Sequence, residues 1–157
     1  MTDDARANAD RLRVLNAAFT SNVPFNAALG LELVEADSGV ATLRLPYRED
    51  LVGNPENGVL HGGVVTSVVD AACGAAVFLT LRPLRPIATL DLRIDYLRAA
   101  EPGKDLLCRA RCSRIATHVA FVQAIAHHGD PAAAVATAAA TFMIFAGGQR
   151  SSSPEAT

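Results

Sequence analysis

Apolar residues recur along the chain with two different periods, and the changes of period mark the elements of the fold. Near the N-terminus they recur at helical spacing, with Leu12, Leu15 and Phe19 on one stripe, and Pro24 prevents this helix from continuing. Further along they alternate with polar residues, as in strands, except in one long apolar helix. The predicted elements are a leader helix, two strands, the apolar helix and four more strands, at residues 4–19, 31–36, 40–47, 62–81, 87–97, 106–114, 118–128 and 132–145.

Alternation is clearest in the stretch IATLDLRIDYL, which predicts a strand with one apolar face. That face comprises Ala88, Leu90, Leu92, Ile94 and Tyr96, and the opposite face Thr89, Asp91, Arg93 and Asp95. The turns between strands are too short for crossover helices, except around the central helix. We therefore predict an α+β fold, in which the long helix lies across one face of a six-stranded, mostly antiparallel sheet. The loop GNPENG, before the helix, is where we expect function.

Length and composition fit one compact domain, because 157 residues with 50% hydrophobic and 5% aromatic side chains can form a sizeable core. We expect an N-terminal helical leader at residues 1–25, the domain proper at 26–146 and a disordered tail at 147–157.

Charge and hydropathy narrow the class of partner. A formal net charge of −2 argues against nucleic acid, whose phosphates require clustered Lys and Arg. No apolar run reaches the roughly 20 residues of a membrane-spanning helix, and the charged N-terminus lacks the apolar stretch of a signal peptide. We expect a cytoplasmic protein that has no contact with a membrane.

Cysteine and histidine spacing gives no sign of a metal site. Cys73, Cys108 and Cys112 cannot all pair, and no CxxC arrangement lies near the histidines, so we interpret the three as reduced core thiols. His127 and His128 precede the turn residues GDP, which favours a solvated loop for both.

The stretch NGVLHGGVVTSVVDAACG sets a histidine and two glycines directly before the apolar helix. Gly62 and Gly63 lower helix propensity, so their position at a helix start suggests that something approaches the backbone there. The free N–H groups of a first helical turn, with the positive end of the helix dipole, can hold a developing negative charge. The alternative is that both glycines only allow a turn or close packing.

Asp70 is a carboxylate within this apolar helix, where an unpartnered charge would be costly to bury. Either it is hydrogen-bonded in the core, for which Thr66 and Ser67 are available, or it is functional. Gly62 lies eight residues earlier, which is roughly 12 Å along an α-helix, too far for both to reach one carbonyl carbon. Two antiparallel copies of the helix would bring Asp70 of one chain to the HGG turn of the other, and a symmetric dimer would hold two such sites.

The stretch GNPENGVLHGGVVTSVVDAACG, followed by PIATLDLRIDYLR, resembles the hotdog-fold acyl-CoA thioesterases, in the branch that includes phenylacetyl-CoA-type and 4-hydroxybenzoyl-CoA-type enzymes. The likeness covers about residues 30–145, and its most specific part is HGG with an acidic residue nine positions after the histidine, met by His61 and Asp70. It implies a six-stranded antiparallel sheet wrapped around a long helix, with composite sites in a homodimer and often a homotetramer.

The resemblance also implies roles for particular residues. The Gly62 N–H would polarise the thioester carbonyl, His61 would help shape that pocket, and Asp70 would act as general base on water or as nucleophile. Thr89 falls where some relatives carry a hydroxyl that positions the attacking water. The alternative for Thr89 is a strand former that faces solvent or a subunit contact.

Two further assignments complete the expected site. Relatives commonly carry Asn or Gln six residues before the histidine, where this chain has Pro55, and we assign that role to Asn54 rather than Asn57. Each asparagine is also ordinary turn chemistry. Substrate contacts are expected at Gly63 and Ser67.

The function expected from the sequence is hydrolysis of an acyl-CoA, with no metal and no bound cofactor. The arginines available for the CoA phosphates are Arg82, Arg85, Arg98, Arg109, Arg111 and Arg114. Two alternatives stay open. One is a non-catalytic acyl-CoA-binding or regulatory hotdog module, and the other is an acyl-thioester hydratase or dehydratase, although no second acid-base residue is evident near Asp70.

Overall fold

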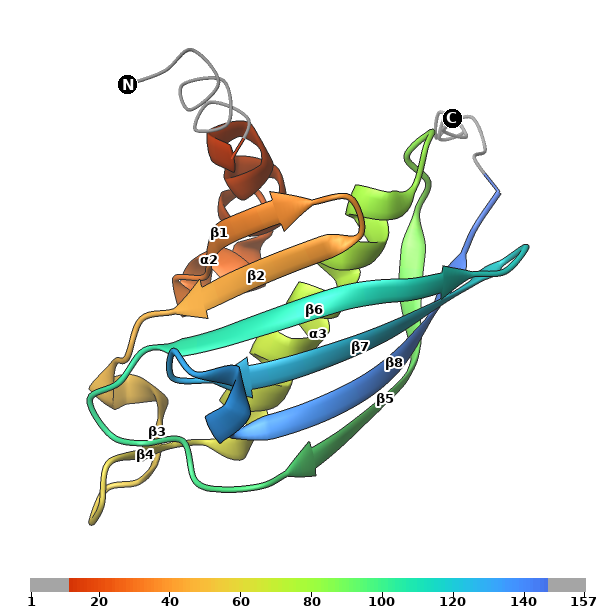
Figure 1. Ribbon diagram of the computed structural model, residues 1–157. Helices are drawn as coiled ribbons and strands as arrows, with labels where there is room; N and C mark the ends of the chain where they lie inside the picture. The colour runs from red at the N-terminus through yellow and green to blue at the C-terminus, as the bar shows by residue number, and fades with distance from the viewer. Residues whose placement is uncertain (1–11, 147–157) are drawn as a thin grey trace, which may run out of the picture.

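The long helix α3 lies across the inner face of a curved six-stranded sheet (Figure 1). The computed structural model describes residues 12–146, so the predicted start of the leader helix and the tail at 147–157 lie outside the described residues. The strands are β1 Glu32–Asp37, β2 Val40–Leu45, β3 Val52–Asn54, β4 Val59–Leu60, β5 Ile87–Tyr96, β6 Leu106–Ile115, β7 Val119–His127 and β8 Ala136–Ile144. The helical segments are η1 Ala17–Ser21, α2 Pro24–Leu29, η2 Glu49–Leu51, α3 Gly62–Thr80 and η3 Pro131–Ala133.

The sheet has the strand order β1-β2-β6-β7-β8-β5, and every neighbouring pair is antiparallel. The predicted α+β architecture, six antiparallel strands around one long helix, is confirmed. β1 and β5 form the two edges of the sheet. The core lies between α3 and the inner residues of the strands, where Val68, Leu43 and Leu106 are at most 1% exposed.

Helix α3 is apolar on most of its surface because it is a core helix. Its length and composition alone would suffice to cross a membrane, with 19 residues and a mean hydropathy of 1.7, but half of it is buried against the sheet. Core helices meet the same criteria, so this feature is weak evidence for membrane insertion.

The N-terminal segment lies beside the β1–β2 edge of the sheet (Figure 1), and its Phe19 ring contacts Phe78 of α3. Residues 12–16 are helical and continue into η1, a single π-helical turn, after which Pro24 begins the short helix α2. Proline suits the first turn of a helix because a backbone N–H at that position would have no intrahelical acceptor, so its absence costs no hydrogen bond. The predicted stripe of Leu12, Leu15 and Phe19 packs against the core.

Strand β5 departs from the strict alternation that its sequence predicts. Thr89 pairs with Phe142 and Asp91 with Thr141, so Leu90 is an extra residue in a β-bulge. Because the bulge shifts the phase of the side chains, Thr89 lies on the same face as Leu92, turned toward α3, and Leu90 is 54% exposed. The expected placement of Leu90 on the apolar face and Thr89 on the opposite face is wrong.

The expected loop GNPENG, residues 53–58, forms the end of β3 and the turn to β4 in a short antiparallel hairpin. This hairpin packs directly against the start of α3, since the His61 N–H donates to the Leu51 carbonyl at 2.9 Å. A Cβ on Gly53 would lie 2.8 Å from His61 Cα. Glycine is therefore required at position 53, because any side chain there would displace the backbone at the helix entrance.

His127 is not in a solvated loop, as the adjacent turn residues suggested. It is the last residue of β7 and is 6% exposed, and its Nδ1 accepts a hydrogen bond from the Gly129 N–H at 2.9 Å. Burial lowers the pKa of His127 because it disfavours the imidazolium form. His128 is half-buried and its Nε2 accepts from the Glu101 N–H at 2.9 Å.

The three cysteines are free, as predicted. Cys73 and Cys108 are buried, and Cys112 is half-buried. Burial raises the pKa of Cys73 to about 12, with a further contribution from the negative charge of Asp70, and it raises the pKa of Cys108 well above its usual value. Both thiols are therefore inert core side chains at neutral pH.

Candidate active site

The start of α3 is held in place by the histidine that precedes it. His61 is the N-cap residue, and its Nδ1 accepts a hydrogen bond from the Gly63 N–H at 2.9 Å. The Val64 N–H donates to the His61 carbonyl at 2.9 Å. Within residues 12–146 the N–H of Gly62 has no hydrogen-bond partner. The helix tip therefore presents one free backbone donor beside a histidine ring of fixed orientation.

Tyr96 anchors this helix tip to the end of β5, and sequence reasoning assigned it no such role. Its hydroxyl donates to the Gly62 carbonyl at 2.8 Å and lies 2.7 Å from Thr66 Oγ1. Tyr96 lies on the face of β5 that carries Leu92 and Ile94, because the pairing of β5 with β8 is regular from Asp91 to Tyr96. No local sequence signal links Tyr96 to Gly62, because the contact joins residues 34 positions apart.

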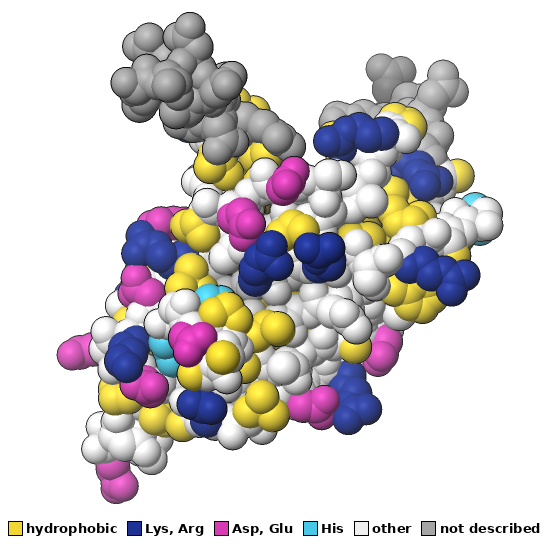
Figure 2. Space-filling view, in the orientation of Figure 1, with side chains coloured by type: hydrophobic (Ala, Val, Ile, Leu, Met, Phe, Trp, Pro, Cys, Tyr) yellow, Lys and Arg dark blue, Asp and Glu magenta, His cyan; other side chains and the backbone are white. Residues whose placement is uncertain are grey.

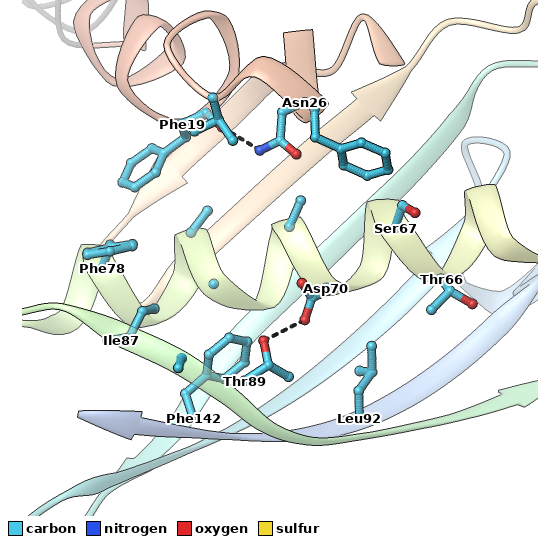
Figure 3. Close-up of a pocket in the computed structure, with 16 residues that line it drawn as sticks. Phe19, Asn26, Thr66, Ser67, Asp70, Phe78, Ile87, Thr89, Leu92 and Phe142 are labelled. Carbon is cyan, nitrogen blue, oxygen red and sulfur yellow. Dashed lines mark hydrogen bonds between the residues drawn. The ribbon is translucent and has the colours of Figure 1, made fainter. Parts of the chain in front are cut away.

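The Asp70 side chain lines a cavity of about 530 Å³ that lies between α3, the N-terminal segment and β5. Its Oδ1 accepts a hydrogen bond from Thr89 Oγ1 at 2.8 Å (Figure 3). The side chain is half-buried. Apart from Asp70, the polar groups of the lining are few, and the wall is formed chiefly by Phe19, Val23, Phe25, Ala71, Gly74, Ala75, Phe78, Ile87, Ala88, Leu92 and Phe142.

The hydroxyls of Thr66 and Ser67 do not satisfy Asp70, which was the structural alternative for this carboxylate. Thr66 donates to the Gly62 carbonyl at 3.1 Å and Ser67 to the Gly63 carbonyl at 2.9 Å, so both bond back to their own helix. Ser67 still lines the Asp70 cavity, and its role as a substrate contact stays a prediction. Asp70 thus has its hydrogen bond from β5 and not from the helix that carries it.

The helix tip faces a second, separate cavity of about 360 Å³. Gly62 and Tyr96 line it together with Arg98, one of the six arginines considered for phosphate binding. Asp70 and Thr89 do not line this cavity. Since α3 is an unbroken helix from Gly62 to Thr80, the roughly 12 Å rise between Gly62 and Asp70 holds. Within one chain the Asp70 carboxylate and the free Gly62 N–H are therefore too far apart to act on the same carbonyl carbon.

Asn54 and Asn57 both act in the β3–β4 turn within the single chain. Asn54 Oδ1 accepts from the Glu56 N–H at 3.0 Å, and Asn57 Oδ1 accepts from the Val59 N–H at 3.2 Å. Neither lines the Asp70 cavity or the helix-tip cavity. The role assigned to Asn54 stays a prediction, as do the roles of Gly63 and His61.

The fold and these residues define a class of protein. The family model of the thioesterase superfamily matches residues 57–135, which include the helix tip, α3, β5, β6 and β7. This stretch is about half of the chain. The chain belongs to the thioesterase superfamily.

Individual relatives agree with that assignment. The chain is 33% identical over 146 residues to the medium/long-chain acyl-CoA thioesterase YigI of Salmonella typhimurium, with 85% of this chain and 93% of the relative covered. A protein of Pseudomonas aeruginosa with a known crystal structure is 39% identical, with a TM-score of 0.75 over 84% of this chain and 97% of that one. The PaaI protein of the phenylacetic acid degradation operon of E. coli, 21% identical over 84% of this chain and 92% of that one, shares the fold with a TM-score of 0.74.

Proposed function

We propose that this protein hydrolyses the thioester of an acyl-CoA to a free acid and CoA. The observation that carries the proposal is the Asp70 carboxylate, which opens into an apolar cavity and is oriented by a 2.8 Å hydrogen bond from Thr89. A carboxylate held at the wall of an apolar cavity is suited to act on a reacting group bound there. Membership of the thioesterase superfamily and 33% identity to a relative named as an acyl-CoA thioesterase support the same reaction.

The proposed chemistry uses protein groups alone. A thioester is a good electrophile, so a carboxylate and one well-placed backbone donor can suffice. The Gly62 N–H stabilises the oxyanion, His61 fixes the geometry of that turn, and Asp70 either deprotonates water or attacks the carbonyl carbon. In both routes the C–S bond breaks and CoA leaves as the thiol. In the second route water then hydrolyses the mixed anhydride between Asp70 and the acyl group. When this water attacks the Asp70 carbonyl, a single turnover in labelled water leaves the product acid unlabelled, whereas water activated by a general base labels the product.

The free N–H and the carboxylate are proposed to meet across a homodimer. β5 is an edge strand that pairs with β8 on one side only, and it carries the exposed apolar residue Leu90. A two-fold axis beside β5 would extend the sheet and set the two α3 helices antiparallel. Asp70 would then approach Gly62 of the partner subunit. The roughly 12 Å rise between the two residues on one helix is the reason that a monomer is insufficient.

Further parts of the proposal concern assembly, location and CoA recognition. Arginine and lysine side chains lie across the outer face of the sheet (Figure 2), and we propose that dimers pair into tetramers through this polar face. Sedimentation analysis at several protein concentrations tests both association steps.

Arg98, in the cavity beside Gly62, is the arginine that we propose for a CoA phosphate. The reaction is proposed to occur in the cytoplasm.

The primary test measures release of free thiol from a panel of acyl-CoA compounds, with Asp70→Asn as the matched variant. We expect turnover in the native protein and a loss of at least about a hundredfold in Asp70→Asn, with acyl-CoA affinity retained, because the amide keeps the shape but cannot act as a base. No turnover on any compound would favour the binding module. Undiminished turnover in Asp70→Asn would eliminate the role of this carboxylate.

Complementation between two inactive variants tests the composite site. A heterodimer of an Asp70→Asn chain and a Gly62→Pro chain, purified with two different tags, has one site with both changes and one site with neither. About half of the native activity per dimer is therefore expected. If each site were contained in a single chain, every site in the heterodimer would carry one defect and the activity would stay at the level of the single variants.

A further inference from the structure

We infer that the Asp70 cavity measures the length of an aliphatic acyl chain, with the Phe19 and Phe78 rings as the end stop. This inference rests on the proposed function and adds the substrate class to it. The cavity of about 530 Å³ lies within the range of about 300–1,000 Å³ that is usual for small-molecule sites. Its chemistry differs along its length, and that difference gives the bound chain a direction.

The hydroxyl and carboxylate groups of the cavity lie at one end and in the middle, and the Phe19 and Phe78 rings lie at the opposite end. Figure 3 shows Thr66 and Ser67 at one end of the α3 face that lines the cavity. The Asp70–Thr89 pair lies nearer the middle, and Phe19 and Phe78 lie at the opposite end. A thioester carbonyl beside Asp70 would therefore direct its hydrocarbon tail toward the aromatic end. Among residues 12–146, Asp70 is the one charged side chain that lines the cavity, so an apolar tail meets no other charge of the described chain there.

The helix provides the length scale. Asp70 and Phe78 lie eight residues apart on α3, a rise of about 12 Å. C–C bonds of about 1.5 Å advance an extended chain by roughly 1.25 Å per carbon, so about 12 Å accommodates roughly nine or ten carbons. A short arylacetyl group would leave the aromatic end empty. The geometry thus favours medium-length aliphatic chains.

The end stop is held from two separate elements. The Phe19 and Phe78 ring centroids are 5.6 Å apart with an interplanar angle of 39°, a favourable contact for aromatic rings. Asn26 of α2 donates from Nδ2 to the Phe19 carbonyl at 2.8 Å and so fixes the turn that carries this ring. Phe78 is only half-buried. A smaller side chain at position 78 would therefore open the cavity without removing a fully buried core residue.

Gly74 keeps the middle of the cavity wide. It lies on the lined stripe of α3 between Asp70 and Phe78. A Cβ added there would lie 3.8 Å from Phe142 Cε1, an ordinary van der Waals contact. The backbone therefore tolerates a side chain at position 74, and such a side chain would occupy space that the acyl chain needs. Gly74 and Phe78 give two variants with opposite expected effects on the preferred chain length.

The experiment measures kcat/KM for saturated acyl-CoA compounds with chains from about four to about fourteen carbons. In the native protein we expect a rise of about fourfold per added CH2, the equivalent of burying one methylene, up to roughly nine or ten carbons, followed by a fall. Phe78→Ala should extend the rise by at least about two carbons, which is a gain of roughly fifteenfold on the longer chains relative to shorter ones. Gly74→Val should move the optimum to shorter chains.

Phe121→Ala is the matched control, because Phe121 lies on the outer face of the sheet and not in the cavity. Its chain-length profile should equal that of the native protein. If Phe78→Ala fails to fold in a thermal melt, Gly74→Val and the milder Gly74→Ala decide the question. Unchanged profiles in folded variants would overturn the inference while leaving the thioesterase proposal intact. Absence of thiol release from every acyl-CoA in the native protein would instead overturn the proposed function.

Discussion

Replacing Gly62 by proline removes the one atom group to which we assign oxyanion stabilisation, the N–H of residue 62. The position is unusually suited to this change. Gly62 is the first residue of α3, where proline is well accepted. His61 has φ −62° and ψ 135°, a conformation that residues before proline prefer. A Cβ at position 62 would meet nothing closer than Tyr96 Oη at 3.7 Å.

The expected magnitudes follow from these contacts. Because the Gly62 N–H has no partner within residues 12–146, proline breaks no hydrogen bond of the described fold. The more rigid unfolded chain should leave stability unchanged or raise it by about 0.4–1 kcal/mol. Loss of one oxyanion donor in other hydrolases lowers kcat by about 10²–10³. We therefore expect Gly62→Pro to melt at or slightly above the native temperature and to lose about a hundredfold or more in kcat.

The assay combines thiol release with thermal denaturation on the same preparations. Gly62→Ala is the matched control, since it adds a side chain but keeps the N–H, and it should lose less than about tenfold. Circular dichroism and sedimentation should show a native fold and an unchanged oligomeric state in Gly62→Pro. A folded Gly62→Pro protein with more than about a tenth of the native kcat would refute the assigned role of this N–H.

Three further expectations concern other residues. Thr89→Val removes the hydroxyl that holds Asp70, and at about 1.5 kcal/mol for a hydrogen bond to a charged group kcat should fall about tenfold, with recovery in Thr89→Ser. Arg98→Ala should raise KM in a salt-dependent manner, while Arg111→Ala, which changes an exposed arginine that lines neither cavity, should not. Burial lowers the pKa of His127, so below about pH 6.5 the unfolded chain binds more protons than the folded chain. The free energy of unfolding should therefore decrease as the pH falls below that value. Thermal denaturation should show a smaller decrease in His127→Asn.

Local sequence patterns determined the elements and the chemistry of the helix tip. The sequence predicted a strand over residues 106–114, and β6 spans Leu106–Ile115 with Leu106, Cys108 and Ala110 buried on its covered face. The apolar run from Gly62 predicted α3 within one residue at its end. The HGG motif and Asp70 were recognisable because glycines at a helix start and a carboxylate in an apolar helix each conflict with local preference.

Tertiary structure alone decided how these residues meet. The bulge at Leu90, which turns Thr89 toward Asp70, depends on the pairing of β5 with β8, and no period in one strand reveals an extra residue relative to its partner. The contact of Tyr96 with Gly62 likewise joins segments distant in sequence. The sequence by itself thus determined the six strands of the main sheet, the long helix and the candidate reactive groups, because these follow from spacing within a few residues. The register between strands and the walls of the Asp70 cavity were decided only by the folded chain, because they arise from contacts between elements far apart along it.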